Sequence, residues 1–255
     1  MLSKRPDGFH ELETVFYPLP LHDILESVTS SESGFELTGT DLELAPADNL
    51  CLRANQLLRN DFPHLPLLKL HLHKLIPVGA GLGGGSADAA FTLMMLNNKY
   101  RLGLTSEALQ RYALELGSDC PFFMLNTACV ARGRGEILTP LNLDLSGYRI
   151  VLINPGIHIN TGLAFSMITP DTGNLPPAEV VQGPVEKWKY QLVNDFELPV
   201  TTRYPVIKHL ISQLYEAGAT YAAMTGTGST VYGLFPKLIT PDIRLPAGYF
   251  VKVLG

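Results

Sequence analysis

The sequence predicts an α+β protein, and three observations support that fold class. Strand-like and helix-like segments follow one another without the regular βαβ alternation that builds a parallel sheet. Residues 68–74 alternate apolar and polar side chains, which is typical of a strand with one face in water and favours an antiparallel sheet. The chain has 255 residues, of which 46% are hydrophobic, so it can form one large core or two modest ones.

The first half of the chain is predicted to open with strands. The turn Arg5-Pro6-Asp7-Gly8 is interpreted as the end of a hairpin whose first arm is absent. Residues 12–17 fit a strand that Pro18 ends, because proline cannot donate to a ladder of hydrogen bonds. A further strand is expected over residues 23–29.

Helices follow, each predicted from a cap and a periodic apolar face. Asn49 is expected to cap the first, and Thr105 to cap a later one that ends at Gly117. Between them, a helix is expected to bury the stripe Ala87, Ala90, Phe91, Met94 and Met95.

The second half is predicted to begin near residue 147, where a short polar break precedes a strand over residues 148–154. Residues 168–183 are rich in proline and glycine and are expected to form a long loop. A helix is predicted to begin at Pro205 and to stop at Gly218. A domain boundary is therefore expected near residue 147.

Composition limits the classes of function. The chain has 24 acidic and 19 basic side chains, so it has no basic surplus for a nucleic-acid partner. No apolar run reaches the ~18 residues of a membrane helix, and the N-terminal residues lack the apolar segment of a signal peptide. The three cysteines have no CxxC spacing and are predicted to be free thiols. These features predict a cytoplasmic protein without a nucleic-acid or membrane partner.

The most informative segment is residues 77–90, Pro-Val-Gly-Ala-Gly-Leu-Gly-Gly-Gly-Ser-Ala-Asp-Ala-Ala. Five of the seven residues from 79 to 85 are glycine, and a helix-forming run follows at once. Glycine lets the backbone approach a ligand closely, and the free N–H groups at a helix N-terminus attract anions. The segment therefore predicts a phosphate-binding loop rather than a flexible linker.

Three other phosphate-binding motifs do not fit this segment. Gly79, Gly81 and Gly84 satisfy GxGxxG, but the dinucleotide fold needs a buried parallel strand before it and an acidic residue ~20 positions later. A Walker loop needs Gly-Lys-Ser/Thr, and Gly85-Ser86 lacks the lysine. The HRD and DFG motifs of protein kinases are absent from the sequence.

Two motifs resemble those of the GHMP kinase family, which includes galactokinase, homoserine kinase and mevalonate kinase. Residues 77–86 resemble its second motif, Pro-x-Gly-x-Gly-Leu-Gly-Ser-Ser, and residues 223–235 resemble its third, a glycine turn between two strands. The resemblance implies a ribosomal protein S5 domain 2-like ATP-binding domain over residues 1–147 and a ferredoxin-like domain over residues 148–255. It also implies ATP as phosphoryl donor, with Mg²⁺ arriving on the nucleotide.

Four further segments resemble one branch of this family, namely residues 4–12, 117–123, 133–136 and 194–197. The resemblance spans essentially the whole chain, although Phe9 stands where the branch has tyrosine. It implies ATP-dependent phosphorylation of the 2-hydroxyl of a cytidine diphosphate methylerythritol, in the methylerythritol phosphate pathway of isoprenoid biosynthesis.

The resemblance also implies roles for single residues. Asp119 would be the general base that accepts the proton of the attacking hydroxyl. ATP would contact Asn49, Leu50, Lys74, Pro77, Gly79, Gly81, Leu82, Gly83, Gly84, Gly85 and Ser86. The cytidine substrate would contact Phe9, His10, Thr161, Phe165, Gly226, Thr227 and Gly228. Ser86 is also a candidate Mg²⁺ contact, and no dedicated metal-binding cluster is predicted.

Two alternatives remain open. The family's first motif, Pro-Ala-Lys-Ile-Asn-Leu, would lie shortly before Arg5 and is not in the sequence. The first alternative is therefore a non-catalytic nucleotide-binding protein on the same scaffold. The second is another GHMP kinase, such as a homoserine or mevalonate kinase. A monomer or a weak homodimer is expected in each case.

Overall fold

A computed structural model describes residues 1–6, 8–40, 45–169 and 173–255. Asp7 of the predicted turn and residues 170–172 of the predicted loop lie outside this range. Contacts within the chain define two compact units, unit 1 with residues 1–19, 79–82 and 128–255, and unit 2 with residues 20–78 and 83–127. The domain boundary near residue 147 stays a prediction.

Unit 1 contains a four-stranded antiparallel sheet in the order β1-β2-β6-β7. Its strands are β1 (Ser3–Lys4), β2 (His10–Phe16), β6 (Cys129–Gly133) and β7 (Ile137–Pro140). The hairpin predicted to lack its first arm has one, because Lys4 pairs with His10 across the turn. The first arm was not predicted because it is only two residues long.

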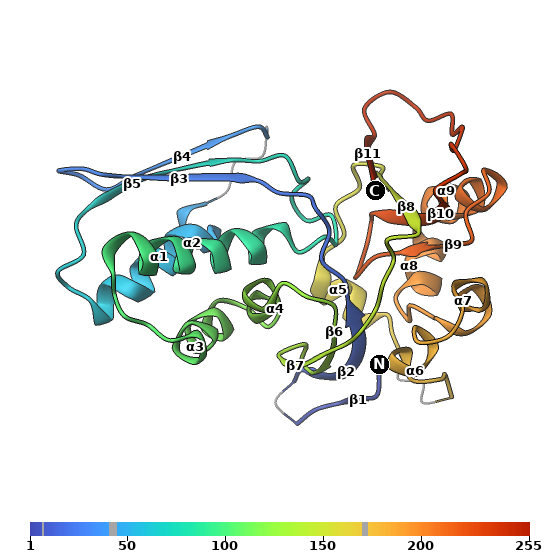
Figure 1. Ribbon diagram of the computed structural model, residues 1–255, viewed down its shortest axis with the longest axis horizontal. Coiled ribbons are helices and arrows are strands. Elements are labelled where there is room, and N and C mark those ends of the chain that lie inside the picture. Colours follow the sequence, from blue (N-terminus) through green and yellow to red (C-terminus); the bar gives the residue numbers. More distant parts are fainter. Residues whose placement is uncertain (7, 41–44, 170–172) are drawn as a thin grey trace. The chain divides into compact units, whose positions relative to one another are not determined.

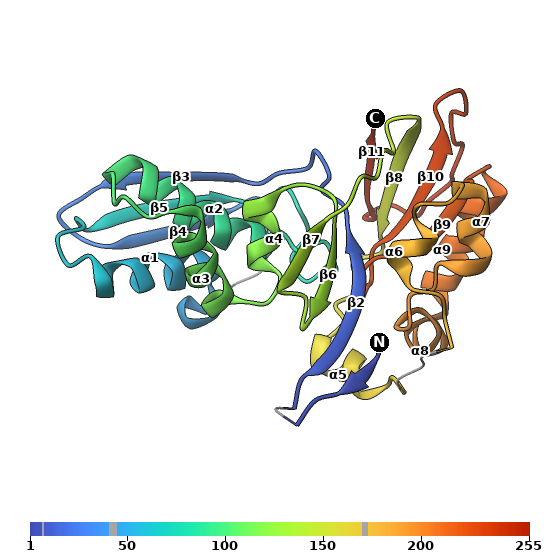
Figure 2. The same ribbon diagram turned by 60° about the horizontal axis from the view of Figure 1, so that its bottom comes forward.

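A second sheet of unit 1 has the order β11-β8-β10-β9, with antiparallel neighbours throughout (Figure 2). It is formed by β8 (Tyr148–Asn154), β9 (Tyr221–Met224), β10 (Val231–Pro236) and β11 (Phe250–Leu254). If the four strands are numbered along the chain, their order across the sheet is 4-1-3-2, which is that of a ferredoxin-like sheet. The connection over residues 237–249, all of it described, contains no helix, so the second crossover helix of that fold is replaced by a loop.

The described residues between β8 and β9 form the helices α5 (Thr161–Ser166), α6 (Pro177–Val180), α7 (Val185–Gln191), α8 (Glu197–Arg203) and α9 (Pro205–Glu216). The predicted helix at Pro205 is confirmed, and its buried side chains Ile207, Leu210 and Leu214 share a core with the sheet. The prediction of an uninterrupted loop over 168–183 is wrong at α6, a single turn that begins with proline.

In unit 2, a mixed three-stranded sheet packs against helices (Figure 1). The sheet has the order β3-β5-β4, with β3 (Ile24–Thr29), β4 (Gly34–Thr38) and β5 (Leu68–His73). The alternation predicted for β5 is confirmed, because Leu68, Leu70 and Leu72 are buried. A purely antiparallel sheet was a wrong expectation, since β5 pairs antiparallel with β3 and parallel with β4.

The described part of unit 2 contains the 3₁₀ turn η1 (Pro46–Asp48) and the helices α1 (Leu50–Asp61), α2 (Gly84–Tyr100), α3 (Ser106–Leu116) and α4 (Cys120–Leu125). The predicted caps at Asn49 and Thr105 are confirmed, because each side chain accepts a backbone hydrogen bond from the first turn of its helix. The predicted stop at Gly117 is also confirmed.

The prediction of which side chains form the buried stripe of α2 is wrong. Ala90 is buried as expected, but Phe91 is 47% exposed, and the core-facing side chains are Ala89, Leu93 and Leu96. Apolar residues occur on several sides of this helix, so periodicity alone does not select one face. The buried side also includes Asp88, which has an ionic partner.

Candidate active site

The glycine loop reaches α2 through left-handed backbone. Gly79, Gly81 and Gly83 have φ angles of 66°, 75° and 70°. Gly83 is the N-cap of α2, and Ser86 lies inside the first turn of the helix. A Cβ atom built on Gly81 would lie 2.6 Å from the carbonyl oxygen of Thr225, which leaves room for glycine alone.

The second and third predicted motifs meet within unit 1. The hydroxyl of Thr225 donates to the carbonyl oxygen of Gly81 at 3.2 Å, and the N–H of Thr230 donates to that of Ala80, also at 3.2 Å. The glycine turn joins β9 to β10, as predicted, and contains Gly226, Thr227 and Gly228. Two segments that lie far apart in the sequence therefore form one backbone-lined surface.

The segment Asn194-Asp195-Phe196-Glu197 supports this turn. The side-chain amide of Asn194 donates to the carbonyl oxygens of Met224 and Gly226, at 2.8 and 2.9 Å. A carboxylate oxygen of Glu197 accepts from the N–H of Met224 at 2.9 Å. The turn is thus fixed by side chains of a neighbouring segment as well as by its own strands.

Aromatic side chains of unit 1 form the second group of predicted site residues. The rings of His10 and Phe165 are stacked, and Phe165 packs edge-on against Phe196. Phe9 is 49% exposed, with the guanidinium carbon of Arg134 lying 4.6 Å from its ring centroid. Thr161 is the first residue of α5 and is exposed. The stacking partner of Phe165 is therefore His10.

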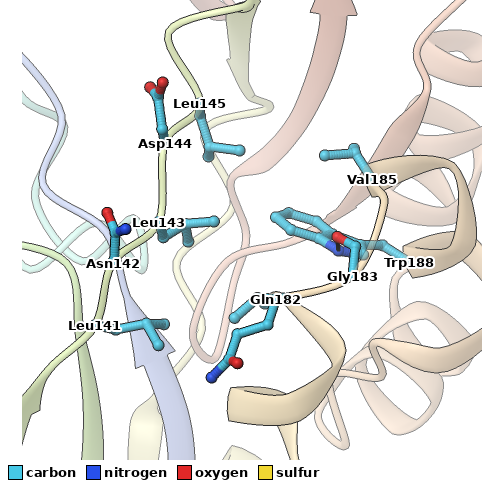
Figure 3. Close-up of a pocket in the computed structure, with 10 residues that line it drawn as sticks. Leu141, Asn142, Leu143, Asp144, Leu145, Gln182, Gly183, Val185 and Trp188 are labelled. Carbon is cyan, nitrogen blue, oxygen red and sulfur yellow. Dashed lines mark hydrogen bonds between the residues drawn. The ribbon is translucent and has the colours of Figure 1, made fainter.

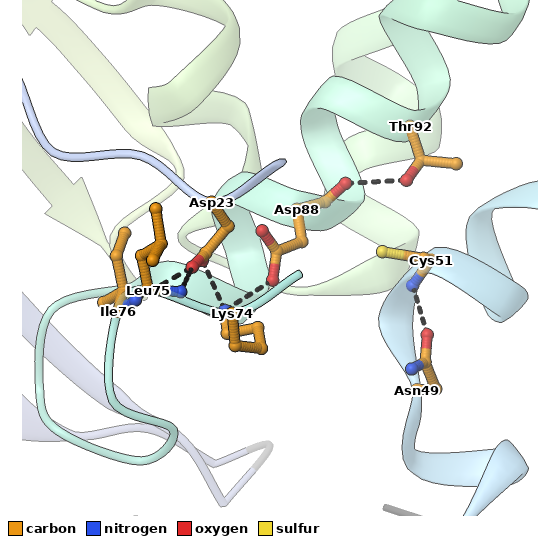
Figure 4. Close-up of polar contacts among 8 residues, drawn as sticks. All are labelled: Asp23, Asn49, Cys51, Lys74, Leu75, Ile76, Asp88 and Thr92. Atoms are coloured by element: carbon orange, nitrogen blue, oxygen red, sulfur yellow. Dashed lines mark hydrogen bonds and ion pairs between the residues drawn. The ribbon is translucent and has the colours of Figure 1, made fainter. Parts of the chain in front are cut away.

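Unit 2 contains a buried ionic cluster of Asp23, Lys74 and Asp88 (Figure 4). Lys74 Nζ lies 2.5 Å from Asp23 Oδ2 and 2.7 Å from Asp88 Oδ2, and only 4% of the lysine side chain is exposed. Burial alone would lower the pKa of Lys74, but the two carboxylates outweigh it and raise this pKa. Burial raises the pKa of Asp88 to about 6, although the lysine charge acts in the opposite direction.

Asn49, Leu50 and Lys74, which were predicted to contact adenine, all lie in unit 2. Asn49 Oδ1 accepts from the N–H groups of Cys51 and Leu52, at 3.0 and 3.1 Å, so this oxygen is already used as a helix cap. Two carboxylates occupy the ammonium group of Lys74. The adenine contacts of these residues stay predictions.

Asp119 lies at the N-cap position of α4, and its side chain makes no capping hydrogen bond. Its side chain is exposed, yet the surrounding protein desolvates the carboxylate and raises the pKa of Asp119 above its ordinary value of 3.8. The next residue, Cys120, is buried and hydrogen-bonded to Ser86, with a thiol pKa that burial raises to about 11. Asp119 is therefore fixed beside the first turn of α2.

Sequence reasoning missed Asp23, Asp88 and Arg134. Asp88 carried a usable signal, because a lone acidic residue among alanines early in an apolar helix calls for a buried partner. Nothing in the residues around Asp23 or Arg134 indicates their contacts.

A cavity of about 510 Å³ lies elsewhere in unit 1 (Figure 3). It is lined by Leu141, Asn142, Leu143, Asp144, Leu145, Val181, Gln182, Gly183, Val185 and Trp188, none of them a predicted site residue. The indole N–H of Trp188 donates to the carbonyl oxygen of Gly183, so its polar atom is already paired. Across the described residues, no group of three or more metal-ligating side chains occurs, and no helix is long and apolar enough to cross a membrane.

Two family models match the chain. The GHMP kinases N-terminal domain matches residues 49–127, and the GHMP kinases C-terminal domain matches residues 186–242. The first match contains the glycine loop and Asp119, and the second contains the turn at 226–228.

Curated relatives carry one common description. The 4-diphosphocytidyl-2-C-methyl-D-erythritol kinase of Cytophaga hutchinsonii is 46% identical over 236 residues, which is 92% of this chain and 87% of the relative. The kinase of the same name from Bacteroides fragilis is 48% identical over 237 residues, 91% of this chain and 86% of the relative.

Solved structures of kinases are similar to this chain in fold. A crystal structure of 4-(cytidine 5'-diphospho)-2C-methyl-D-erythritol kinase is 29% identical, with a TM-score of 0.79, and the match covers 100% of this chain and 94% of that one. A homoserine kinase from Cytophaga hutchinsonii shares the fold at 16% identity, with a TM-score of 0.64 and coverage of 96% and 94%. The predicted two-domain GHMP kinase fold is confirmed. The chain belongs to the GHMP kinase family and, within it, to the 4-diphosphocytidyl-2-C-methyl-D-erythritol kinases.

Proposed function

We propose that this protein transfers the γ-phosphoryl group of ATP to the 2-hydroxyl of 4-diphosphocytidyl-2-C-methyl-D-erythritol. The observation that carries the proposal is the glycine loop, whose left-handed glycines lead into the N-terminus of the 17-residue helix α2. The names of the relatives support the choice of acceptor. A loop of this kind serves phosphoryl transfer, in which catalysis consists mainly of positioning and charge stabilisation.

Backbone amides are proposed to supply most of the positive field on the phosphates. The first N–H groups of α2 have no partner within the helix, and the helix dipole adds about half a positive charge at that end. The loop residues Gly79, Gly81, Leu82, Gly83, Gly84 and Gly85 carry this role, with Pro77 at the approach. Mg²⁺ would arrive with ATP and meet the hydroxyl of Ser86, and Asn49 and Leu50 are proposed on the adenine side, whereas the ammonium of Lys74 is engaged by two carboxylates.

Asp119 is proposed as the general base. The residue is exposed and its side chain makes no capping hydrogen bond, so the carboxylate can accept a proton from a hydroxyl of the substrate. Desolvation raises its pKa, which strengthens it as a base relative to a free aspartate. Proton acceptance of this kind contributes typically ~10²–10⁴-fold to a rate.

The cytidine group is proposed to bind in unit 1. Phe9 presents a half-exposed ring for stacking, and the imidazole of His10 offers a donor and an acceptor for the edge of the base. Phe165 acts by stacking on His10 and orienting its ring. Thr161 and the turn of Gly226, Thr227 and Gly228 are proposed to contact the rest of the substrate.

A direct assay tests the reaction. The protein is incubated with ATP, Mg²⁺ and the cytidyl substrate, ADP release is followed, and the product is identified by mass spectrometry. We expect ADP and one added phosphate on the methylerythritol, with homoserine and mevalonate inactive as acceptors. Turnover of homoserine or mevalonate instead would assign another GHMP activity. ATP binding without turnover of any acceptor would indicate a nucleotide-binding protein that is not an enzyme.

A further inference from the structure

The ionic cluster of Asp23, Lys74 and Asp88 brackets the glycine loop. Lys74 follows the last residue of β5, and Asp88 lies in the second turn of α2, so the loop runs between them (Figure 4). Asp23 precedes β3 and joins them from a third segment. All three belong to unit 2, and less than a tenth of each side chain is exposed, at 2%, 4% and 9%.

The cluster is joined to the backbone on both sides of the loop. Asp23 Oδ1 accepts from the N–H groups of Leu75 and Ile76, at 2.5 and 2.8 Å, and these two residues immediately precede Pro77. On the other side, Lys74 Nζ lies 3.3 Å from where a Cβ of Gly84, the first residue of α2, would stand. Lys74 thus lies close to the first residue of α2, while Asp23 fixes the segment that leads from β5 into the loop.

Stability does not explain why these charges are buried. Removing two carboxylates and an ammonium from water is costly, and apolar side chains of similar size often serve equally well in a core. Buried ionic groups are best attested as devices that select one arrangement among several. Here the arrangement that they select is the separation and direction of the two ends of the loop.

We propose that Asp23, Lys74 and Asp88 are positioning residues for the glycine loop, and that they set its affinity for the triphosphate of a nucleotide regardless of the base. This inference rests on the proposed function only in that the loop binds a triphosphate. It assigns Lys74 a role through the loop, with its ammonium engaged by two carboxylates. If Lys74 instead contacted adenine directly, its loss would weaken the binding of ATP but leave the binding of inorganic triphosphate unchanged.

The main test replaces the cluster by apolar side chains, in the triple variant Asp23→Leu, Lys74→Met, Asp88→Leu. This variant leaves no unpaired buried charge. Circular dichroism checks the fold, calorimetry gives the Kd of Mg²⁺-ATP, and competition gives the Ki of inorganic triphosphate, which has no base. We expect both constants to rise by the same factor, about tenfold or more, because small misplacements of binding groups cost such factors.

A matched control removes an exposed ion pair of the same unit. Lys69 and Glu32 lie 2.8 Å apart, with half or more of each side chain exposed. The double variant Lys69→Met, Glu32→Leu should leave both constants unchanged. Wild-type affinity for ATP in the folded triple variant would overturn the proposal. A weaker Kd for ATP with an unchanged Ki for triphosphate would overturn it too, because that pattern indicates a base contact.

A second measurement serves if the triple variant does not fold. Asp23→Asn keeps the size of the side chain but sets an amide against the ammonium of Lys74. Hydrogen exchange of this variant should be faster at Leu75, Ile76 and residues 78–86, with β8 as protected as in the wild type. Unchanged exchange over residues 75–86 would overturn the proposal. The cytidyl substrate is absent from these binding and exchange experiments. A wild type that binds ATP without transferring phosphate would therefore contradict the proposed reaction, and the role of the cluster in triphosphate binding could still be tested.

Discussion

The imidazole of His10 lies nearly parallel to the ring of Phe165, with 4.8 Å between ring centroids and 20° between planes. His10 begins β2, and Phe165 lies in α5, so two distant segments set one stack. Phe196 braces the pair, with its ring edge-on to Phe165 at 4.9 Å and 86°. The orientation of the imidazole is therefore determined by packing before any base arrives.

Loss of this stack should weaken binding of the cytidyl substrate. Aromatic pairs are worth about 0.5–1.5 kcal/mol beyond their buried area, so Phe165→Leu should raise the KM for this substrate about 2- to 12-fold. The KM for ATP should stay close to that of the wild type. Phe165→Tyr retains the ring and serves as the control. Steady-state kinetics with each substrate varied in turn provides the measurement, and equal changes in the two KM values would contradict the assignment.

Asp119→Asn should abolish most turnover while ATP still binds. The amide cannot accept the proton, so kcat is expected to fall by about 10²–10⁴-fold with little change in the Kd for ATP. The exposed Asp242→Asn, outside the proposed site, should behave as the wild type. An Asp119→Asn variant with wild-type kcat would exclude this residue as the base.

The pH dependence of kcat should also show the titration of Asp119. The pKa of Asp119 is raised above its ordinary value of 3.8, so on acidification the carboxylate is protonated at a higher pH than a free aspartate. Activity is therefore expected to be complete above this raised pKa and to fall below it. Rates measured across the acidic range test the point, and an acidic limb at or below 3.8 would be inconsistent with Asp119 as the group that titrates.

Gly81→Ala should both destabilise the protein and weaken ATP binding. The left-handed backbone costs a side chain about 1–2 kcal/mol, and the new Cβ would also meet the backbone of Thr225. Gly103 is the matched control, because its φ is 73° and nothing lies within 4 Å of its Cβ position. Chemical denaturation should show a larger loss for Gly81→Ala, and only that variant should lose affinity for ATP. Equal effects of the two substitutions would show that the contact with Thr225 is unimportant.

Asn49→Ala should lower the free energy of unfolding by about 1 kcal/mol, which is typical for the loss of a capping side chain. The Asn49 oxygen accepts from two N–H groups at the start of α1, and the residue is 3% exposed, so water cannot replace it readily. Asn49→Asp keeps an accepting oxygen and should restore most of the stability. Denaturation is measured without nucleotide, and a variant as stable as the wild type would mean that the cap is redundant.

Local features of this protein were predictable from the sequence because they depend on near neighbours. A cap such as Asn49 or Thr105 and the glycine loop each act over a few residues, and the structure confirms both caps. The turn between β9 and β10 was predictable for the same reason. Likewise, the family could be identified because its two glycine motifs are specific as a pair.

Non-local features were not predictable, because the sequence pattern of one partner says nothing about the other. The alternation in β5 predicts a half-buried strand but does not choose between a parallel and an antiparallel neighbour. Asp23 and Lys74 are 51 positions apart, and the residues around Asp23 resemble those of any strand entrance. The buried face of α2 depends on which side chains surround it, and Asp88 is buried with Lys74 as its ionic partner.

The pairing of β2 with β6 has a consequence for synthesis on the ribosome. Glu13 of β2 and Arg132 of β6 are hydrogen-bonded but 119 positions apart, and all of unit 2 lies between these strands in the chain. At ~5–20 residues per second, β2 waits roughly ten seconds for its partner.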